Sequence, residues 1–321
     1  MSKVAIVTLA GDLHARVIRR QLQEAHDVDV AVVACDTLSA AGGLTWSNVA
    51  GPELTLPTED GGRVSVTDLD LVWWRRCHGR PNVPDAVTDP QMRKLVVKDN
   101  RAGLRGLLMA GFTGAWISDP YATERAQNKI LQLSVARSVG LTVPRTLIST
   151  DPSAVREFTR AHGGTVIAKT LTGLLGTSLE AGRVTLDSLD NDDEITVSAT
   201  VYQEEIPGTD HLRVMVFGEK VHAARIRSDE LDWRLANDME VAPIVIDERL
   251  SVRLREVTTR LGLRMGVFDV KLPPNGEPVF LEINPQGQFL FVEGMSDMPL
   301  GEAFAEFIVD ELAALRRPVF A

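Results

Sequence analysis

The stretch Phe280-Leu281-Glu282-Ile283-Asn284, near the end of the chain, places the polar Glu282 and Asn284 on either side of Ile283 in an otherwise apolar run. Successive side chains of a β-strand point to opposite faces, so Glu282 and Asn284 are predicted to share one face. A second apolar stretch, Val267–Leu272, precedes it, and the turn residues Pro273-Pro274-Asn275-Gly276 separate the two. We therefore expect a hairpin that also brings Asp269 to the face of Glu282 and Asn284.

The two halves of the chain show different patterns. Alternating strands and helices open it, which predicts an α/β lobe with a doubly wound parallel sheet ending near residue 120. The second half mixes helices with antiparallel strands, and Gly218-Glu219 marks a hairpin turn between Leu212–Phe217 and Lys220–Arg227. We expect helices at 14–26, 90–110, 122–139 (capped by Thr123), 248–261 and 299–315, one beginning at Asp151-Pro152, and further strands at 3–9, 28–34, 69–74, 115–117, 166–170 and 201–205.

Composition excludes several classes of protein. The chain has 321 residues and a formal net charge of −10, and an acidic chain repels nucleic-acid backbones. Its 2 cysteines predict no disulfide framework. No apolar run approaches the roughly 20 residues that span a bilayer. We therefore expect a cytoplasmic protein that binds neither nucleic acid nor membrane.

Asp269, Glu282 and Asn284 carry the oxygen ligands that a hard cation prefers. Three such ligands on neighbouring strands suit Mg²⁺, which keeps some waters and takes substrate phosphates as further ligands. The alternative is that these residues form the solvent face of an ordinary edge hairpin.

Two lysines upstream favour the metal site. Lys169 ends an apolar strand, where a charge is costly unless an anion meets it, and Lys129 lies near a helix start. The glycine-containing loop 172–178 can place backbone N–H groups over phosphates and is the candidate lid.

The order of these features resembles that of the ATP-grasp enzymes from about residue 115 to the end of the chain. The resemblance implies an ATP-grasp fold with three parts, which are a domain at 1–120, a small lid lobe at 121–200 and a C-terminal α+β lobe at 201–321. It implies ATP and Mg²⁺ as cofactors. Lys129 and Lys169 match the residues that contact phosphates, and Asp269, Glu282 and Asn284 match the Mg²⁺ ligands. The remaining nucleotide contacts would be Gln203, Glu204 and Glu205 at the adenine, and either Asp210 or His211 at the ribose.

Three longer segments are similar to the microviridin-type, or graspetide, peptide-crosslinking ligases. They are Leu71–Arg76, the helix and strand at 128–133 and 143–148, and the pair formed by Asp232-Trp233-Arg234 and Phe280–Leu290. This resemblance implies a ligase that activates a side-chain carboxylate as an acyl phosphate and joins it to a hydroxyl or amine of a precursor peptide. It also implies a homodimer.

Arginines suit the acceptor side of such a reaction, because a guanidinium binds a carboxylate or acyl phosphate through two bonds. We assign this role to Arg213, Arg225 and Arg234, and the alternative for each is a surface ion pair. Arg75 and Arg76 follow a strand at the end where open α/β sheets bind ligands, or they simply form a solvated strand terminus. Two other functions stay open. One is an ATP-grasp ligase of free amino acids or small carboxylates, and the other is a non-catalytic nucleotide-binding protein.

Overall fold

The computed structural model describes residues 1–38, 43–49, 54–77, 83–172, 181–236 and 238–316. They form two compact units, one made of Met1–Ala122 with Pro299–Ala321 and the other of Thr123–Met298. Residues 299–321 were expected in the C-terminal lobe at 201–321, whereas the structure places Pro299–Ala321 in the first unit. The reason is long-range packing, because the last helix lies against the first one. The predicted division at residue 200 stays a prediction.

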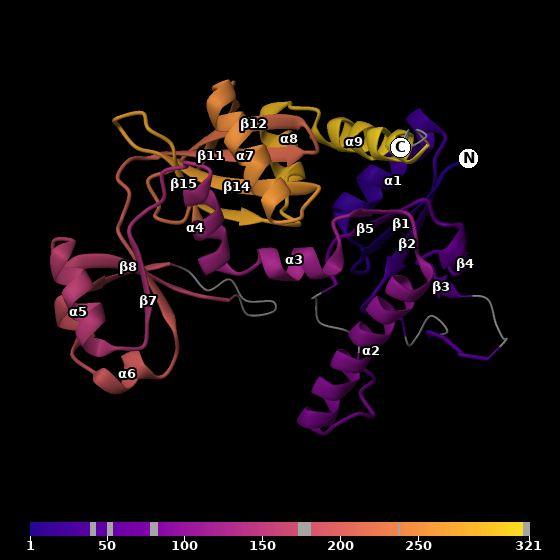
Figure 1. Ribbon diagram of the computed structural model, residues 1–321, viewed down its shortest axis with the longest axis horizontal. Helices are drawn as coiled ribbons and strands as arrows, with labels where there is room; N and C mark the ends of the chain where they lie inside the picture. The colour runs from indigo at the N-terminus through magenta and orange to yellow at the C-terminus, as the bar shows by residue number, and fades with distance from the viewer. Residues whose placement is uncertain (39–42, 50–53, 78–82, 173–180, 237, 317–321) are drawn as a thin grey trace. The chain divides into compact units, whose positions relative to one another are not determined.

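The first unit contains a four-stranded parallel sheet with strand order β2-β1-β5-β6. Helices α1 and α9 pack side by side in this unit (Figure 1). The ring of Trp73 in β5 packs against the ring of Phe304 in α9, with 4.6 Å between the ring centroids. The parallel lobe expected from the opening of the sequence is therefore present. Its elements are β1 Lys3–Thr8, α1 Leu13–His26, β2 Asp29–Ala34, β3 Thr55–Pro57, β4 Arg63–Ser65, β5 Leu71–Trp74, α2 Pro90–Gly111, β6 Ala115–Ile117 and α9 Leu300–Leu315.

Two glycines of the first unit allow a matched test of its packing. A Cβ at Gly114 would lie 2.1 Å from the backbone oxygen of Asp70, whereas a Cβ at Gly106, inside α2, would meet nothing within 4 Å. We expect Gly114→Ala to lower the free energy of unfolding by about 2–3 kcal/mol through overpacking. Gly106→Ala should raise it by roughly 0.5–1 kcal/mol, because alanine favours the helix. Urea denaturation measures both, and equal effects of the two substitutions would contradict this packing.

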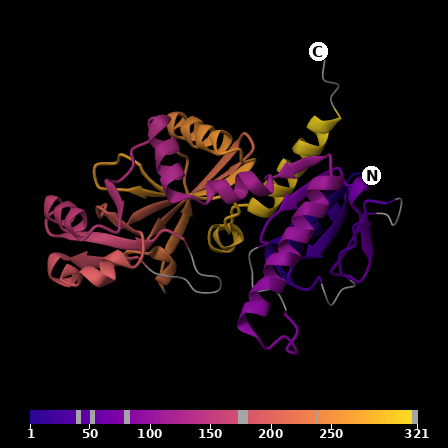
Figure 2. The ribbon, with the colours of Figure 1, turned by 60° about the horizontal axis from the view of Figure 1, so that its bottom comes forward.

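The second unit contains two antiparallel sheets, ordered β7-β10-β8-β9 and β13-β12-β11-β14-β15. Helix α5 packs on the smaller sheet through Val155 and Phe158. Helices α4 and α7 cover one face of the larger sheet (Figure 2) and share a core with it. The elements are α4 Lys129–Ser138, β7 Thr146–Ser149, α5 Pro152–Ala161, β8 Thr165–Thr170, β9 Gly182–Thr185, α6 Asp192–Thr196, β10 Thr200–Gln203, β11 Asp210–Phe217, β12 Lys220–Arg227, β13 Glu240–Pro243, α7 Glu248–Arg260, β14 Met265–Leu272, β15 Val279–Asn284 and α8 Leu290–Ser296.

The helix expected at 122–139 is two helices in the structure. Helix α3 spans Pro120–Ala126, and α4 begins at Lys129 after a new cap, because the side chain of Asn128 accepts a hydrogen bond from the N–H of Leu131. Thr123 lies inside α3, and its hydroxyl has no hydrogen-bond partner among the described residues, so that part of the prediction is wrong. The break places Lys129 in the first turn of a new helix.

Candidate active site

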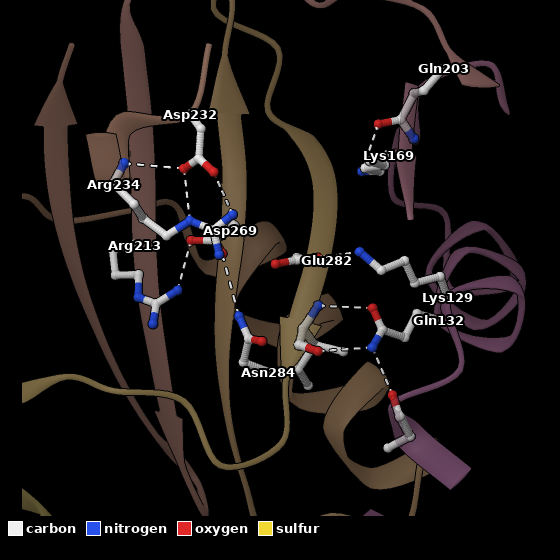
Figure 3. A network of polar contacts seen from close by, with 12 residues as sticks. Lys129, Gln132, Lys169, Gln203, Arg213, Asp232, Arg234, Asp269, Glu282 and Asn284 are labelled. Atoms are coloured by element: carbon white, nitrogen blue, oxygen red, sulfur yellow. Dashed lines mark hydrogen bonds and ion pairs between the residues drawn. The ribbon is translucent and has the colours of Figure 1, made fainter. Parts of the chain in front are cut away.

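Three neighbouring strands bring the predicted metal ligands together. Asp269 on β14 lies directly opposite Glu282 on β15, and Arg213 on β11 lies opposite Asp269. Directly opposed residues share a face of a sheet, and this is the face away from α4 and α7. Asn284 follows two residues after Glu282, and its Nδ2 donates to Asp269 Oδ2 at 3.4 Å. In Figure 3, Glu282 lies between Asp269 on one side and Lys129 on the other.

The two carboxylates differ in their electrostatic setting. Burial raises the pKa of Asp269 above its usual value, Arg213 opposes the rise, and the charge of Glu282 adds to it. Burial also acts to raise the pKa of Glu282, but Lys129 and Lys169 lower it to about 2. A cation bound between the two carboxylates would relieve their mutual repulsion.

The donor set fits Mg²⁺ in particular. Among the described residues, no three His, Cys, Asp or Glu side chains gather to hold a metal. The candidate set instead offers two carboxylates and one amide oxygen, because the amide nitrogen of Asn284 already faces Asp269. Mg²⁺ keeps several waters and takes phosphate oxygens as further ligands, so it needs few protein ligands.

The two predicted lysines reach this region from different elements. Lys129 Nζ donates to Glu282 Oε2 at 3.2 Å. Lys169 Nζ donates to Gln203 Oε1 at 3.0 Å, and Gln203 Nε2 donates to Thr146 Oγ1 at 2.8 Å. Burial lowers the pKa of Lys169 to about 8, and Glu282 opposes the change. A buried ammonium whose hydrogen-bond acceptor is a neutral amide is suited to an anionic ligand such as a phosphate.

Gln132, which the sequence analysis did not single out, joins α4 to β15. Its Nε2 donates to the carbonyl oxygens of Ala126 at 2.7 Å and of Ile283 at 2.9 Å, and its Oε1 accepts from the N–H of Ile283 at 3.2 Å. Ile283 is the neighbour of Glu282, and Gln132 is one turn after Lys129. The buried amide therefore fixes the distance between the lysine and the carboxylate.

We expect Gln132→Leu to lower the free energy of unfolding by about 2–3 kcal/mol, because it leaves three buried backbone groups without partners. Gln127→Leu, at an exposed position one residue before the cap of α4, should change it by less than about 0.5 kcal/mol. Chemical denaturation of both variants checks the difference, and a small effect of Gln132→Leu would show that the amide is dispensable.

Two nitrogens of Arg213 donate hydrogen bonds, and two aromatic rings lie beside its guanidinium. Its NH1 donates to Asp269 Oδ1 at 2.8 Å, and its NH2 donates to the carbonyl oxygen of Gln288 at 2.8 Å. Its guanidinium carbon lies 5.6 Å from the ring of Trp233 and 5.9 Å from that of Phe291, and these rings stack at 5.4 Å. Its Nε is buried and has no hydrogen-bond partner in the part of the chain that the structure describes. Phe291 was not predicted, and Trp233 was noted only as part of a motif.

Arg234 lies beside the same group of charges but is more exposed. Its Nε and NH2 donate to the two carboxylate oxygens of Asp232 at 2.7 and 2.6 Å. The hydrogen bond to Asp232 raises the pKa of Arg234 against the effect of burial, with Glu282 and Asp269 contributing further. About half of the Arg234 side chain is exposed, so it can meet a substrate anion while Asp232 holds it in place.

Arg225 does not join the other predicted arginines. In the β11–β12 hairpin Arg213 pairs with Ala224, so Arg225 lies opposite Leu212 and points to the other face. That face packs against α4 and α7 through Leu212, Val214 and their neighbours. The prediction that Arg225 binds the acceptor therefore conflicts with the register of the hairpin, and we drop it from the site.

The predicted nucleotide contacts at 203–211 are already engaged in polar contacts. Glu204 Oε1 accepts from the N–H of Arg145 at 2.7 Å, and Glu205 binds Arg183 through two hydrogen bonds of 2.8 and 2.7 Å. Of the two ribose candidates, Asp210 pairs with Arg227 at 3.2 Å. The other candidate, His211, lies on the opposite face of β11, which is the face of Arg213.

His211 lies beside a lysine that the sequence analysis missed. Burial lowers the pKa of His211 to about 4, so its Nε2 is free to accept from Lys271 Nζ at 2.8 Å. Lys271 lies two residues after Asp269 on the same face of β14, and that spacing in a strand could have identified it. The candidate lid at 172–178 lies, from residue 173 on, outside the described residues.

Comparison with solved structures finds close likenesses over nearly the whole chain. Macrocyclase MdnC of Microcystis aeruginosa MRC, solved with precursor peptide MdnA, is 26% identical with a TM-score of 0.85, over 96% of this chain and 99% of that chain. The RiPP-associated ATP-grasp ligase of Chryseobacterium gregarium, solved with ADP and a leader and core peptide, is 22% identical with a TM-score of 0.84, over 97% of both chains. ATP-grasp ligase PsnB, solved with a precursor variant, Mg and ADP, is 22% identical with a TM-score of 0.77, over 97% of this chain and 99% of that chain. No family model and no curated protein matches the chain.

Proposed function

From the ATP-grasp fold that this chain shares with the peptide macrocyclases, we propose that it is an ATP- and Mg²⁺-dependent ligase of peptide carboxylates. The predicted fold and the resemblance to the graspetide ligases are confirmed, and an ADP-forming ligase agrees with both. The observation that carries the proposal is the pair of Asp269 and Glu282 on one face of the larger sheet, with Lys129 from the start of α4 bonded to Glu282. An ordinary edge hairpin exposed to solvent would not leave two carboxylates only 13% and 21% exposed beside two lysines.

Each residue of the site has a role in such a reaction. Lys129 and Lys169 would bind the phosphates of ATP, and Asp269, Glu282 and Asn284 would hold Mg²⁺. The metal supplies positive charge that stabilises the transferring phosphoryl group. Arg213 and Arg234 would bind the substrate carboxylate, and later the acyl phosphate, with Arg213 kept in place by the Trp233–Phe291 ring pair.

The reaction has two balanced steps. An oxygen of the substrate carboxylate attacks the γ-phosphorus, and the bond to the bridging oxygen breaks so that ADP leaves. A hydroxyl or amine then attacks the acyl carbon and loses its proton, and phosphate leaves. The net change in the peptide is the loss of one water for each ester or amide bond. Cationic side chains around the transferring group lower the barrier mainly by positioning and electrostatics.

The substrate we favour is a ribosomally made precursor peptide, because the similar macrocyclases are described with such peptides. A ligase of free amino acids or small carboxylates is the second candidate, and the shared site would serve it equally. Absence of nucleic-acid binding, a homodimer and a cytoplasmic location stay predictions. None of the described helices combines the length and the apolar character needed to cross a bilayer.

One assay separates these candidates. The purified protein is incubated with MgATP and either the peptide encoded beside its gene or a panel of free amino acids, and ADP and peptide mass are followed. Loss of one or more waters from the peptide with matching ADP supports the proposal. Turnover with free amino acids alone would favour the second candidate. Tight ATP binding without ADP under any condition would show a non-catalytic nucleotide-binding protein.

A further inference from the structure

Arg75, at the carboxyl end of β5 in the first unit, is a buried arginine with two nitrogens that lack acceptors. Its side chain has 0% exposure, and its Nε donates to Asp12 Oδ2 at 3.0 Å. Its guanidinium carbon lies 5.0 Å from the ring of Trp73. Both NH1 and NH2 are buried and have no hydrogen-bond partner among the described residues. Leaving a charged donor buried and unpaired is costly, so these two nitrogens call for an acceptor.

Within the described part of the chain, the neighbouring side chains do not supply that acceptor. Asp12 Oδ1 accepts from the N–H groups of His14 and Ala15 at the start of α1, and Asp12 Oδ2 accepts from Thr8 Oγ1 as well as from Arg75 Nε. Burial, together with the charge of Arg75, lowers the pKa of His14 to about 3. The histidine is therefore neutral and carries no charge to balance the guanidinium.

Asp12 is the anion that acts on Arg75. Its charge raises the pKa of the guanidinium, whereas burial and the charge of Arg76 lower it. Two further carboxylates, Asp36 and Glu59, bind the loop before Asp12 through the N–H groups of Ala10 and Gly11 at 2.8 and 3.0 Å. Arg75 follows β5 and Asp12 follows β1, and these strands are parallel neighbours. Ligands of open parallel sheets bind at the carboxyl ends of the strands, which is where both residues lie.

We propose that NH1 and NH2 of Arg75 bind one carboxylate group of a ligand, forming a carboxylate subsite in the first unit. With Nε taken by Asp12, the outer edge of the guanidinium is left to form two parallel bonds, and a planar carboxylate fits that edge. The carboxylate comes either from an acidic side chain of a peptide substrate or from a free small carboxylate.

The direct test is crystallographic and does not depend on ligase activity. Crystals of the full chain are soaked in 3-bromopropionate, and the anomalous signal of bromine locates each bound probe. We expect a probe whose carboxylate oxygens lie within hydrogen-bond distance of Arg75 NH1 and NH2. The proposal would be overturned if these nitrogens bind only ordered water while the probe binds elsewhere or nowhere. It would also be overturned if a parallel soak places inorganic phosphate there and 3-bromopropionate stays absent.

Solution binding then separates the two sources of the carboxylate. Calorimetry without nucleotide compares the wild type with Arg75→Gln, with Arg75→Lys, and with the matched control Arg63→Gln, an exposed arginine of β4 in the same unit. If an acidic side chain of the precursor peptide is the ligand, Arg75→Gln should weaken peptide binding by about tenfold or more, since bonds to charged groups are strong. If a free carboxylate is the ligand, propionate binding is lost and peptide binding is unchanged. Unchanged affinity for both in a folded Arg75→Gln would contradict the subsite. Loss of carboxylate binding with normal ligase turnover leaves the proposed function intact.

Discussion

Replacement of Glu282 by glutamine is expected to reduce peptide-dependent formation of ADP by about 10³-fold, because metal charge contributes several kcal/mol to such a reaction and each 1.36 kcal/mol is tenfold. Glutamine keeps the shape of the side chain and an oxygen that can accept from Lys129 Nζ. It removes the negative charge that holds a cation beside Asp269. The loss is therefore expected in turnover and in the Mg²⁺ dependence of ADP binding, with the fold preserved.

The matched control is Glu277→Gln in the turn of the same β14–β15 hairpin. Glu277 is exposed, and its carboxylate accepts from Thr142 Oγ1 at 2.8 Å, far along the hairpin from the metal ligands. Turnover of this variant should stay within about threefold of the wild type, as for most surface changes. Initial rates at saturating MgATP, with circular dichroism to check the fold, measure both variants. Near-normal turnover of Glu282→Gln would remove Glu282 from the metal site.

Local patterns in the sequence predicted part of the geometry of this face. Glu282 and Asn284 share one face, as alternation predicts, and Asp269 joins them there through a β-bulge. The register shifts between Asp269, which faces Glu282, and Val270, which faces Phe280. A regular hairpin fixes which residues face each other, and without the bulge Asp269 would face Leu281. The same rule would have excluded Arg225. With Gly218-Glu219 at the turn, Phe217 faces Lys220, so Arg213 must face Ala224.

Long-range packing could not be predicted in the same way. Gln132 bonds to Ile283, 151 residues away, and its polar side chain in a helix resembles any surface glutamine. The stacking of Trp233 on Phe291 and the return of α9 to the first unit likewise depend on the folded chain. A single sequence offers no periodic signal for such contacts. The buried NH1 and NH2 of Arg75 belong to the same class, because only their surroundings reveal that they lack acceptors.

The two arginines of the β11–β12 hairpin provide the sharpest test of the acceptor site. Arg213→Gln is expected to lower kcat/KM for the peptide by about 10²–10³-fold, the usual cost of losing one preorganised charge-stabilising group. Arg225→Gln, on the opposite face of the same sheet, should stay within about threefold. Both substitutions remove one guanidinium from neighbouring strands, so a general effect of lost charge would act on both.

The role of Arg213 is identified by comparing how Arg213→Gln changes kcat/KM for the peptide and how it changes the affinity for ADP. If it binds the carboxylate or the acyl phosphate, its loss should reduce kcat/KM for the peptide far more than it weakens ADP binding, since Lys129 and Lys169 remain in place. A large loss of ADP affinity with Arg213→Gln would instead assign Arg213 to the metal site, through its bond to Asp269 Oδ1. Equal losses in Arg213→Gln and Arg225→Gln would mean that the face of the sheet does not determine function. Trp233→Leu removes a ring beside the guanidinium of Arg213 but leaves its bonds to Asp269 and Gln288. We therefore expect a loss of kcat/KM for the peptide that lies between the losses in Arg225→Gln and Arg213→Gln.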